Sequence, residues 1–209
     1  SAPEAMAYTA GKEYIEMAVD LDKYQAIGAG PGWGQHTSHA SLLGSIIDQT
    51  QRALVLDADA LNVLAENKPL QERLPVNTII TPHPKEFERL FGKTANDFER
   101  MELALAKAAD LKIIIVLKGR YTLVATPGGI GYFNPTGNPG MATGGSGDVL
   151  TGIITGLAAQ HYTPQQATLL GVYLHGLAGD LAASYRSQEA LIASDLIEHF
   201  GEAFTQARQ

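Results

Sequence analysis

A glycine-dense segment at residues 138–148, directly before an apolar run at 149–159, has the composition of an anion-binding loop. In such a loop the bare backbone N–H groups converge on one point, and the dipole of the following helix adds partial positive charge there. The segment therefore predicts a phosphate cradle. Asp148 would sit beside the bound anion, where a carboxylate is useful only if it handles a proton or a metal ion. A simpler interpretation stays open, in which Ser146 or Asp148 caps the helix and the glycines form a turn.

Four further segments rich in glycine or polar residues each follow a predicted strand directly, at 28–32, 57–62, 81–87 and 118–122. Because ligands of open α/β sheets bind beyond the carboxyl ends of the strands, we expect these segments to line one rim with the cradle. Taken singly, each signal is weak. Asp57 could cap the next helix, Lys118 could be a solvated strand end, and His83 between two prolines could be an ordinary polar residue.

The elements that would position these segments alternate between short β-rich runs and longer helical runs. We expect strands at 24–27, 53–56, 76–80 and 112–117, and helices at 38–51, 60–66, 85–91 and 95–110. A hairpin with strands at 121–125 and 131–133 follows, and then three helical segments run to the C-terminus. This order predicts an α/β fold in three layers, a mostly parallel central sheet with helices on both faces.

The bulk properties narrow the class of protein. The 209 residues can bury one sizeable core, so we expect a single domain over 1–209. A formal net charge of −7 argues against broad attraction to nucleic acid or to an anionic membrane surface. The absence of cysteine excludes a disulfide framework and a thiolate metal site, and it fits a cytoplasmic protein. We expect neither a signal peptide nor a membrane span, because no apolar run approaches roughly 20 residues.

Five segments, taken in order, carry a specific resemblance to a known family. They lie at 28–34, 56–62, 81–87, 117–119 and 137–148. Together they resemble the ADP/ATP-dependent NAD(P)H-hydrate dehydratases, a branch of the ribokinase-like fold, over roughly residues 3 to 200. The Asn-Pro-Gly-Met-Ala-Thr lead at 138–143 is more characteristic than the Gly-Ser-Gly-Asp motif at 145–148, whose pattern many ribokinase-like enzymes share.

This resemblance implies a repair reaction. Hydrated NADH or NADPH (NADHX or NADPHX) carries a hydroxyl on the nicotinamide ring, which is phosphorylated from ADP or ATP and then eliminated as phosphate. Asp148 would take the hydroxyl proton, and the N–H groups of Gly145, Ser146 and Gly147 would stabilise the transferring phosphoryl group.

The resemblance also implies binding roles around this centre. Nucleotide contacts would come from Lys118, Gly119, Arg120, Tyr121, Thr122, Asn138 and Gly147. The hydrated dinucleotide would contact Gly30, Gly32, His83 and Asp148. Magnesium would be held by Glu86 and Asp57, directly or through its waters.

One departure from the family pattern concerns the start of the chain. Family members usually begin with a further strand and helix region that carries a His-Lys-Gly motif and a Gly-Gly-Ser turn. This sequence opens near the Pro-Glu-Ala-Met segment that normally follows that region. We therefore expect an N-terminal strand and helix region of the domain to be missing, which would expose one sheet edge and part of the dinucleotide site.

Two other functions stay open. A ribokinase-like kinase of a vitamin-precursor alcohol would use the same cradle and Asp148 but release a stable phosphorylated product. A non-catalytic subunit would bind ADP or ATP without turnover. The apolar segments at 171–185 and 191–204 can pack on the sheet or on a neighbouring subunit, and we expect a homo-oligomer, with a tetramer among its forms. We interpret Trp33, His36, His39, His161 and His175 as structural or surface residues.

Overall fold

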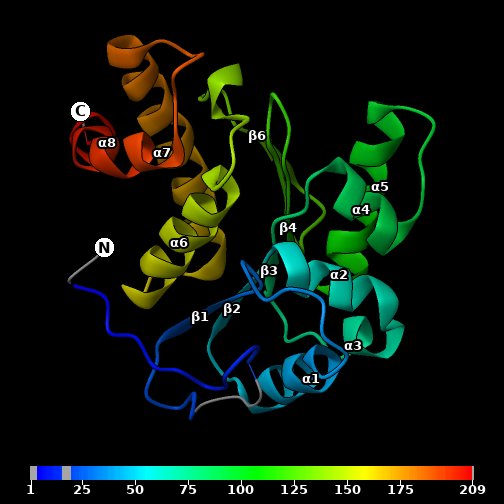
Figure 1. Cartoon of the computed structure of the whole chain (residues 1–209). Helices are drawn as coiled ribbons and strands as arrows, with labels where there is room; N and C mark the ends of the chain where they lie inside the picture. The colour runs from blue at the N-terminus through cyan, green and yellow to red at the C-terminus, as the bar shows by residue number, and fades with distance from the viewer. Residues whose placement is uncertain (1–3, 16–19, 209) are drawn as a thin grey trace.

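A six-stranded sheet forms the centre of the computed structural model, which describes residues 4–15 and 20–208 (Figure 1). The strands lie in chain order, from β1 at one edge to β6 at the other. β1 to β4 pair in parallel, whereas β4, β5 and β6 pair antiparallel. The predicted mostly parallel sheet and its hairpin are confirmed. The strands are β1 (Ala26–Ala29), β2 (Ala53–Leu56), β3 (Ile79–Ile80), β4 (Ile114–Leu117), β5 (Leu123–Ala125) and β6 (Gly131–Phe133).

Helices cover both faces of this sheet (Figure 1). The helices between the parallel strands are α1 (His39–Gln49), α2 (Ala58–Glu66), α3 (Lys68–Glu72), α4 (Pro84–Phe91) and α5 (Asp97–Leu111). The 3-10 turn η1 (Pro139–Met141) and the helices α6 (Ser146–Ala159), α7 (Pro164–Arg186) and α8 (Ala193–Gln206) complete the chain. Within the described ranges, no helix combines the length and the apolar character that a membrane crossing requires.

Alternating side chains of the strands pack into hydrophobic clusters on both faces of the sheet. On one face, Leu56 and its neighbours pack with the helices α1, α2, α4 and α5, where Phe87 is fully buried. On the other face, Val116 packs against Ile154 of α6 and Val172 of α7. All four residues of β4 are buried because both of its faces are covered. The predicted three-layer α/β arrangement is therefore confirmed.

Two local differences from the predicted elements have identifiable causes. The strand expected at 76–80 is restricted to Ile79–Ile80, because Asn77 adopts a left-handed φ of 66° and Val76 is exposed. Thr78 also bonds back to the carbonyl oxygen of Pro75, which makes a turn of the residues before the strand. The short helix α3 was not predicted.

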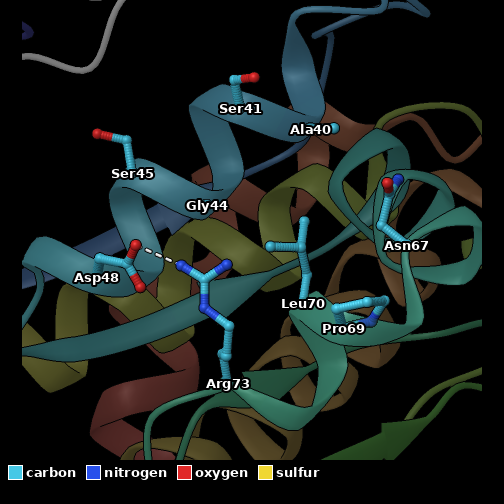
Figure 2. A pocket seen from close by; sticks show the side chains of 9 residues that line it. All are labelled: Ala40, Ser41, Gly44, Ser45, Asp48, Asn67, Pro69, Leu70 and Arg73. Atoms are coloured by element: carbon cyan, nitrogen blue, oxygen red, sulfur yellow. Dashed lines mark hydrogen bonds and ion pairs between the residues drawn. The ribbon is translucent and has the colours of Figure 1, made fainter.

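A hollow of about 410 Å³ lies between α1 and α3 (Figure 2). Ser41, Gly44 and Ser45 of α1 form one wall, and an ion pair between Arg73 and Asp48 closes one side. The lining contains no residue of the predicted site. This hollow is therefore separate from the rim where the sequence predicts chemistry.

Candidate active site

A charged network joins three of the predicted segments at the carboxyl ends of β2, β3 and β4. Asp57, which follows β2, is 1% exposed. Its Oδ1 accepts a hydrogen bond from Lys118 Nζ at 2.9 Å, and its Oδ2 accepts one from Thr151 Oγ1 of α6 at 2.8 Å. Lys118 Nζ also lies 3.9 Å from Glu86 Oε2 of α4. The network places one cation among two carboxylates at the centre of the rim.

The glycine loop meets this network at the N-terminus of α6. Gly145 has a left-handed φ of 85°, which favours glycine, and it gives α6 no side-chain cap. Within the described ranges, the N–H groups of Gly147 and Asp148 have no hydrogen-bond acceptor. A Cβ placed on Gly147 would lie 3.4 Å from Lys118 Nζ, so the ammonium is directly beside this turn. Free amide donors next to a cation form a binding site for an anion.

The alternative interpretation, that Ser146 or Asp148 caps the helix, is contradicted by this geometry. Among residues 4–15 and 20–208, no side chain accepts from the first amides of α6. Asp148 lies exposed in the first turn of the helix, on the same turn as the free N–H groups. An exposed carboxylate beside free amides fits the predicted general base, which must lie within hydrogen-bond reach of the proton it takes.

The loop that leads into the cradle is held by its own contacts. Asn138 Oδ1 accepts from the Gly140 N–H at 3.1 Å, and Asn138 Nδ2 donates to Asp180 Oδ1 at 2.9 Å. Asp180 Oδ2 also accepts from the Gly137 N–H at 2.8 Å. Both polar groups of the Asn138 side chain therefore have protein partners, and its predicted nucleotide contact would use the backbone or exchange one of these bonds.

His83 has a second role that the sequence analysis missed. Its Nδ1 accepts from the N–H groups of Lys85 and Glu86, and Glu86 Oε2 accepts from the His83 N–H at 2.8 Å. This is a reciprocal capping box that begins α4, with Pro84 at the first helical position. His83 Nε2 lies 3.4 Å from Glu86 Oε1. The pattern His-Pro-x-Glu could have indicated this cap.

The glycine loop at 28–34 lies beside the network, and its glycines differ in how much space a side chain would have. A Cβ on Gly30 would lie 1.8 Å from the Asp57 carbonyl oxygen, so no larger residue fits. Gly32 has a φ of 70° and open space around it. The loop is tied to α2 by a bond from the Gly34 N–H to Asp59 Oδ2 at 2.8 Å. Gly32 therefore leaves open space at the predicted substrate side of the rim.

The segment after β4 presents its side chains at the surface. Gly119, Arg120 and Tyr121 are exposed, and the Arg120 guanidinium lies 5.4 Å from the centre of the Tyr121 ring. Thr122 Oγ1 donates to the Gly119 carbonyl oxygen at 3.3 Å. These predicted nucleotide residues thus follow Lys118 on an accessible turn.

His175 of α7, which the sequence predicts to be a structural or surface residue, contacts the first residue of α6. Its Nε2 lies 2.9 Å from the Ser146 carbonyl oxygen and 3.4 Å from Ser146 Oγ. Burial lowers the pKa of His175 to about 4; the bond to Ser146 opposes this effect, and the Lys118 charge adds to it. The sequence analysis also did not identify Thr151. Its position four residues after Gly147 on α6 could have indicated that it faces the same site.

Magnesium would find few free protein ligands at this rim. Among the described residues no three His, Asp or Glu side chains converge as a metal site. The oxygens of Asp57 accept from Lys118 and Thr151, and Glu86 accepts from His83. Magnesium usually keeps several waters and binds mainly through substrate phosphates. The donor set therefore suits an ion held through water rather than by direct ligation.

Comparison with known proteins places the chain in a family. The family model described as NAD(P)H-hydrate dehydratase matches residues 1–200. A bifunctional NAD(P)H-hydrate repair enzyme of Moorella thermoacetica is 42% identical over 201 residues, which cover 95% of this chain and 38% of the relative. The chain thus spans well under half of that relative's length.

Solved structures agree with this assignment. The ADP/ATP-dependent NAD(P)H-hydrate dehydratase of Bacillus subtilis, co-crystallised with ATP/Mg²⁺, is 36% identical with a TM-score of 0.77, over 88% of this chain and 66% of that chain. A ribokinase-like superfamily protein of Enterococcus faecalis is 29% identical with a TM-score of 0.71, over 85% of this chain and 62% of that chain. The chain has the ribokinase-like fold and belongs to the NAD(P)H-hydrate dehydratase family.

Proposed function

We propose that this chain, as one domain over residues 1–209, repairs hydrated NADH and NADPH with ADP or ATP as phosphoryl donor. The observation that carries the proposal is the pair of free N–H groups at Gly147 and Asp148, beside the Lys118 ammonium and the exposed Asp148 carboxylate. Family membership supports the same reaction.

In the proposed reaction Asp148 takes the proton of the ring hydroxyl, and the hydroxyl oxygen attacks the terminal phosphorus of the nucleotide. The new O–P bond forms as the bond to the leaving nucleotide breaks, and the N–H groups of Gly145 and Gly147 stabilise the charge on the phosphoryl oxygens. The Ser146 N–H donates to the Thr143 carbonyl oxygen at 3.4 Å and would join them by exchanging that bond. The phosphorylated ring then releases phosphate with the C–O electron pair, and a neighbouring ring carbon loses a proton. Phosphate is a far better leaving group than hydroxide, which is why phosphorylation comes first.

The surrounding residues bind and orient the two substrates in this proposal. Lys118 supplies a point charge to the nucleotide phosphates, which brings the reacting groups into line. The remaining nucleotide contacts are Gly119, Arg120, Tyr121, Thr122 and Asn138, and the hydrated dinucleotide contacts Gly30, Gly32 and His83. When bound, Mg²⁺ would neutralise phosphate charge, with Glu86 and Asp57 holding its waters.

We further propose that the protein works in the cytoplasm as a homo-oligomer, such as a tetramer. Ile130, Tyr132 and Phe133 lie exposed on the β5–β6 hairpin, at the edge of the sheet. Exposed apolar side chains grouped at a sheet edge favour contact with another subunit. Light scattering on the purified chain, compared with Phe133→Lys, tests this point, since a monomeric wild-type chain would contradict it.

The reaction is tested by the return of reduced-nicotinamide absorbance when the protein is mixed with hydrated NADH, Mg²⁺ and either ADP or ATP. We expect recovery with the wild-type chain and none with Asp148→Asn. Asp97→Asn is the matched control, because Asp97 is also an exposed first-turn aspartate, but on α5. A stable phosphorylated product would instead indicate a kinase, and nucleotide binding without turnover would indicate a non-catalytic subunit.

A further inference from the structure

Helix α7 approaches the cradle along one face that carries small residues. Gly171, His175 and Gly179 are spaced four residues apart and therefore share this face. A Cβ on Gly171 would lie 2.7 Å from Ile154 Cγ1 of α6, and one on Gly179 would lie 2.3 Å from Met141 Sδ in the lead-in loop. The two glycines let α7 pack tightly against the middle of α6 and against the lead-in loop, and His175 lies between them.

The hydrogen bond of His175 acts on a peptide unit of the cradle itself. The Ser146 carbonyl oxygen can only accept, so His175 Nε2 donates across the 2.9 Å between them. The Ser146 carbonyl and the Gly147 N–H belong to one planar trans peptide and point in opposite directions. A donor that fixes the carbonyl behind the helix therefore fixes the direction of the free N–H in front of it, and polarises that N–H as well.

We propose that His175 is a positioning residue for the proposed phosphoryl transfer, aiming the Gly147 N–H at the phosphoryl group through its bond to the Ser146 carbonyl oxygen. The proposal rests on the proposed dehydratase function for its effect on rate. Its structural part, the control of one peptide unit, stands on the contact itself.

Burial is the main reason that this donor stays neutral. Of the charged groups nearby, the Lys118 ammonium follows β4 and is paired with Asp57, and Asp180 on α7 is bonded to Gly137 and Asn138. Burial and Lys118 together lower the pKa of His175 to about 4. A neutral imidazole keeps its Nε2–H across the neutral pH range, so it holds the peptide without exchanging protons with the substrate.

Substitutions that keep or remove the donor test the proposal. His175→Leu should lower kcat about tenfold while the KM for ADP changes less than about threefold, because the aimed N–H acts mainly in the transition state. His175→Gln places an amide Nε2–H near the same point and should restore most of the rate. His199→Leu is the matched control, since His199 Nδ1 makes a similar bond to the Asp195 carbonyl oxygen on α8.

Two outcomes of these assays would overturn the proposal. A folded His175→Leu variant that turns over at the wild-type rate shows that the bond does not position the cradle. Loss of one limb of the kcat–pH profile in that variant shows that His175 transfers a proton. An unchanged profile at a lower rate, with rescue by His175→Gln, supports positioning.

Nuclear magnetic resonance of the wild-type chain separates this proposal from the proposed function. We expect the His175 ring to carry its proton on Nε2 and not to titrate above about pH 5, in line with its pKa of about 4. The Gly147 amide resonance should move in His175→Leu and return in His175→Gln, with or without turnover. If the wild-type chain recovers no NADH, the dehydratase function fails, whereas an unmoved Gly147 amide contradicts the role of His175.

Discussion

The helices α4 and α6 begin at the same rim, but the N-terminus of α4 is capped by side chains and that of α6 is not. At α4, the His83 ring accepts from the first amides and Glu86 returns the bond. At α6, Gly145 provides no cap, and the N–H groups of Gly147 and Asp148 stay free within the described part of the chain. Both ends have the same helix dipole. Only the end whose amides are not used by side chains keeps free donors for an anion.

The largest expected effect comes from removing the carboxylate at the uncapped end. Asp148→Asn should lower kcat by about 10²- to 10⁴-fold, because a general base acts in the transition state. Nucleotide affinity, measured by calorimetry, should change little. If affinity falls as far as the rate does, Asp148 serves binding and the assigned role is wrong; Asp97→Asn should leave both values unchanged.

Lys118→Met would remove the cation that lies between the two helix ends. Asp57 is 1% exposed and would lose its ion-pair partner, so the free energy of unfolding should fall by about 3 kcal/mol. Nucleotide affinity should fall as well. Adding Asp57→Asn to the same chain should restore much of the stability but not the affinity. Denaturant unfolding and calorimetry check both parts, and unchanged affinity would place Lys118 outside the nucleotide site.

The pH dependence of the free energy of unfolding tests whether His175, which contacts the start of α6, is buried as a neutral ring. The unfolded chain binds a proton at His175 near pH 6.5, whereas the folded chain does so only at about pH 4. Stability should therefore be lost as pH falls between these values, by about 3 kcal/mol from this residue. His175→Leu should lack this part of the acid loss. Equal acid sensitivity of the two chains would show that His175 is not buried as a neutral ring.

The smallest expected effect comes from breaking the capped end. His83→Ala removes the acceptor of the Lys85 and Glu86 amides and should cost about 1 kcal/mol of unfolding free energy. His83→Asn, which can still accept at an N-cap, should cost less. Thermal unfolding of the three chains checks the order. If His83→Ala is as stable as the wild type, the capping box does not hold α4.

The rim was predictable from sequence because it follows from strand order. Residues directly after parallel strands meet at one edge, so strand order groups Asp57 and Lys118. The glycine loop follows the antiparallel hairpin, and its own composition predicted its place at the rim. The partners of Asp57 were not predictable, since Lys118 is 61 and Thr151 is 94 residues away along the chain. The contact between His175 and the Ser146 carbonyl oxygen was not predictable, because it depends on how closely α7 packs on α6, which only the two glycines on its face indicate.

The most direct test of the central comparison is to follow backbone amide resonances while MgADP is added to the ¹⁵N-labelled chain. The amides of Gly147 and Asp148 should shift and saturate, whereas those of Lys85 and Glu86 should stay in place because their N–H groups are bonded to His83. Saturable shifts at the α4 amides, with none at the α6 amides, would show that the uncapped helix end does not bind the nucleotide.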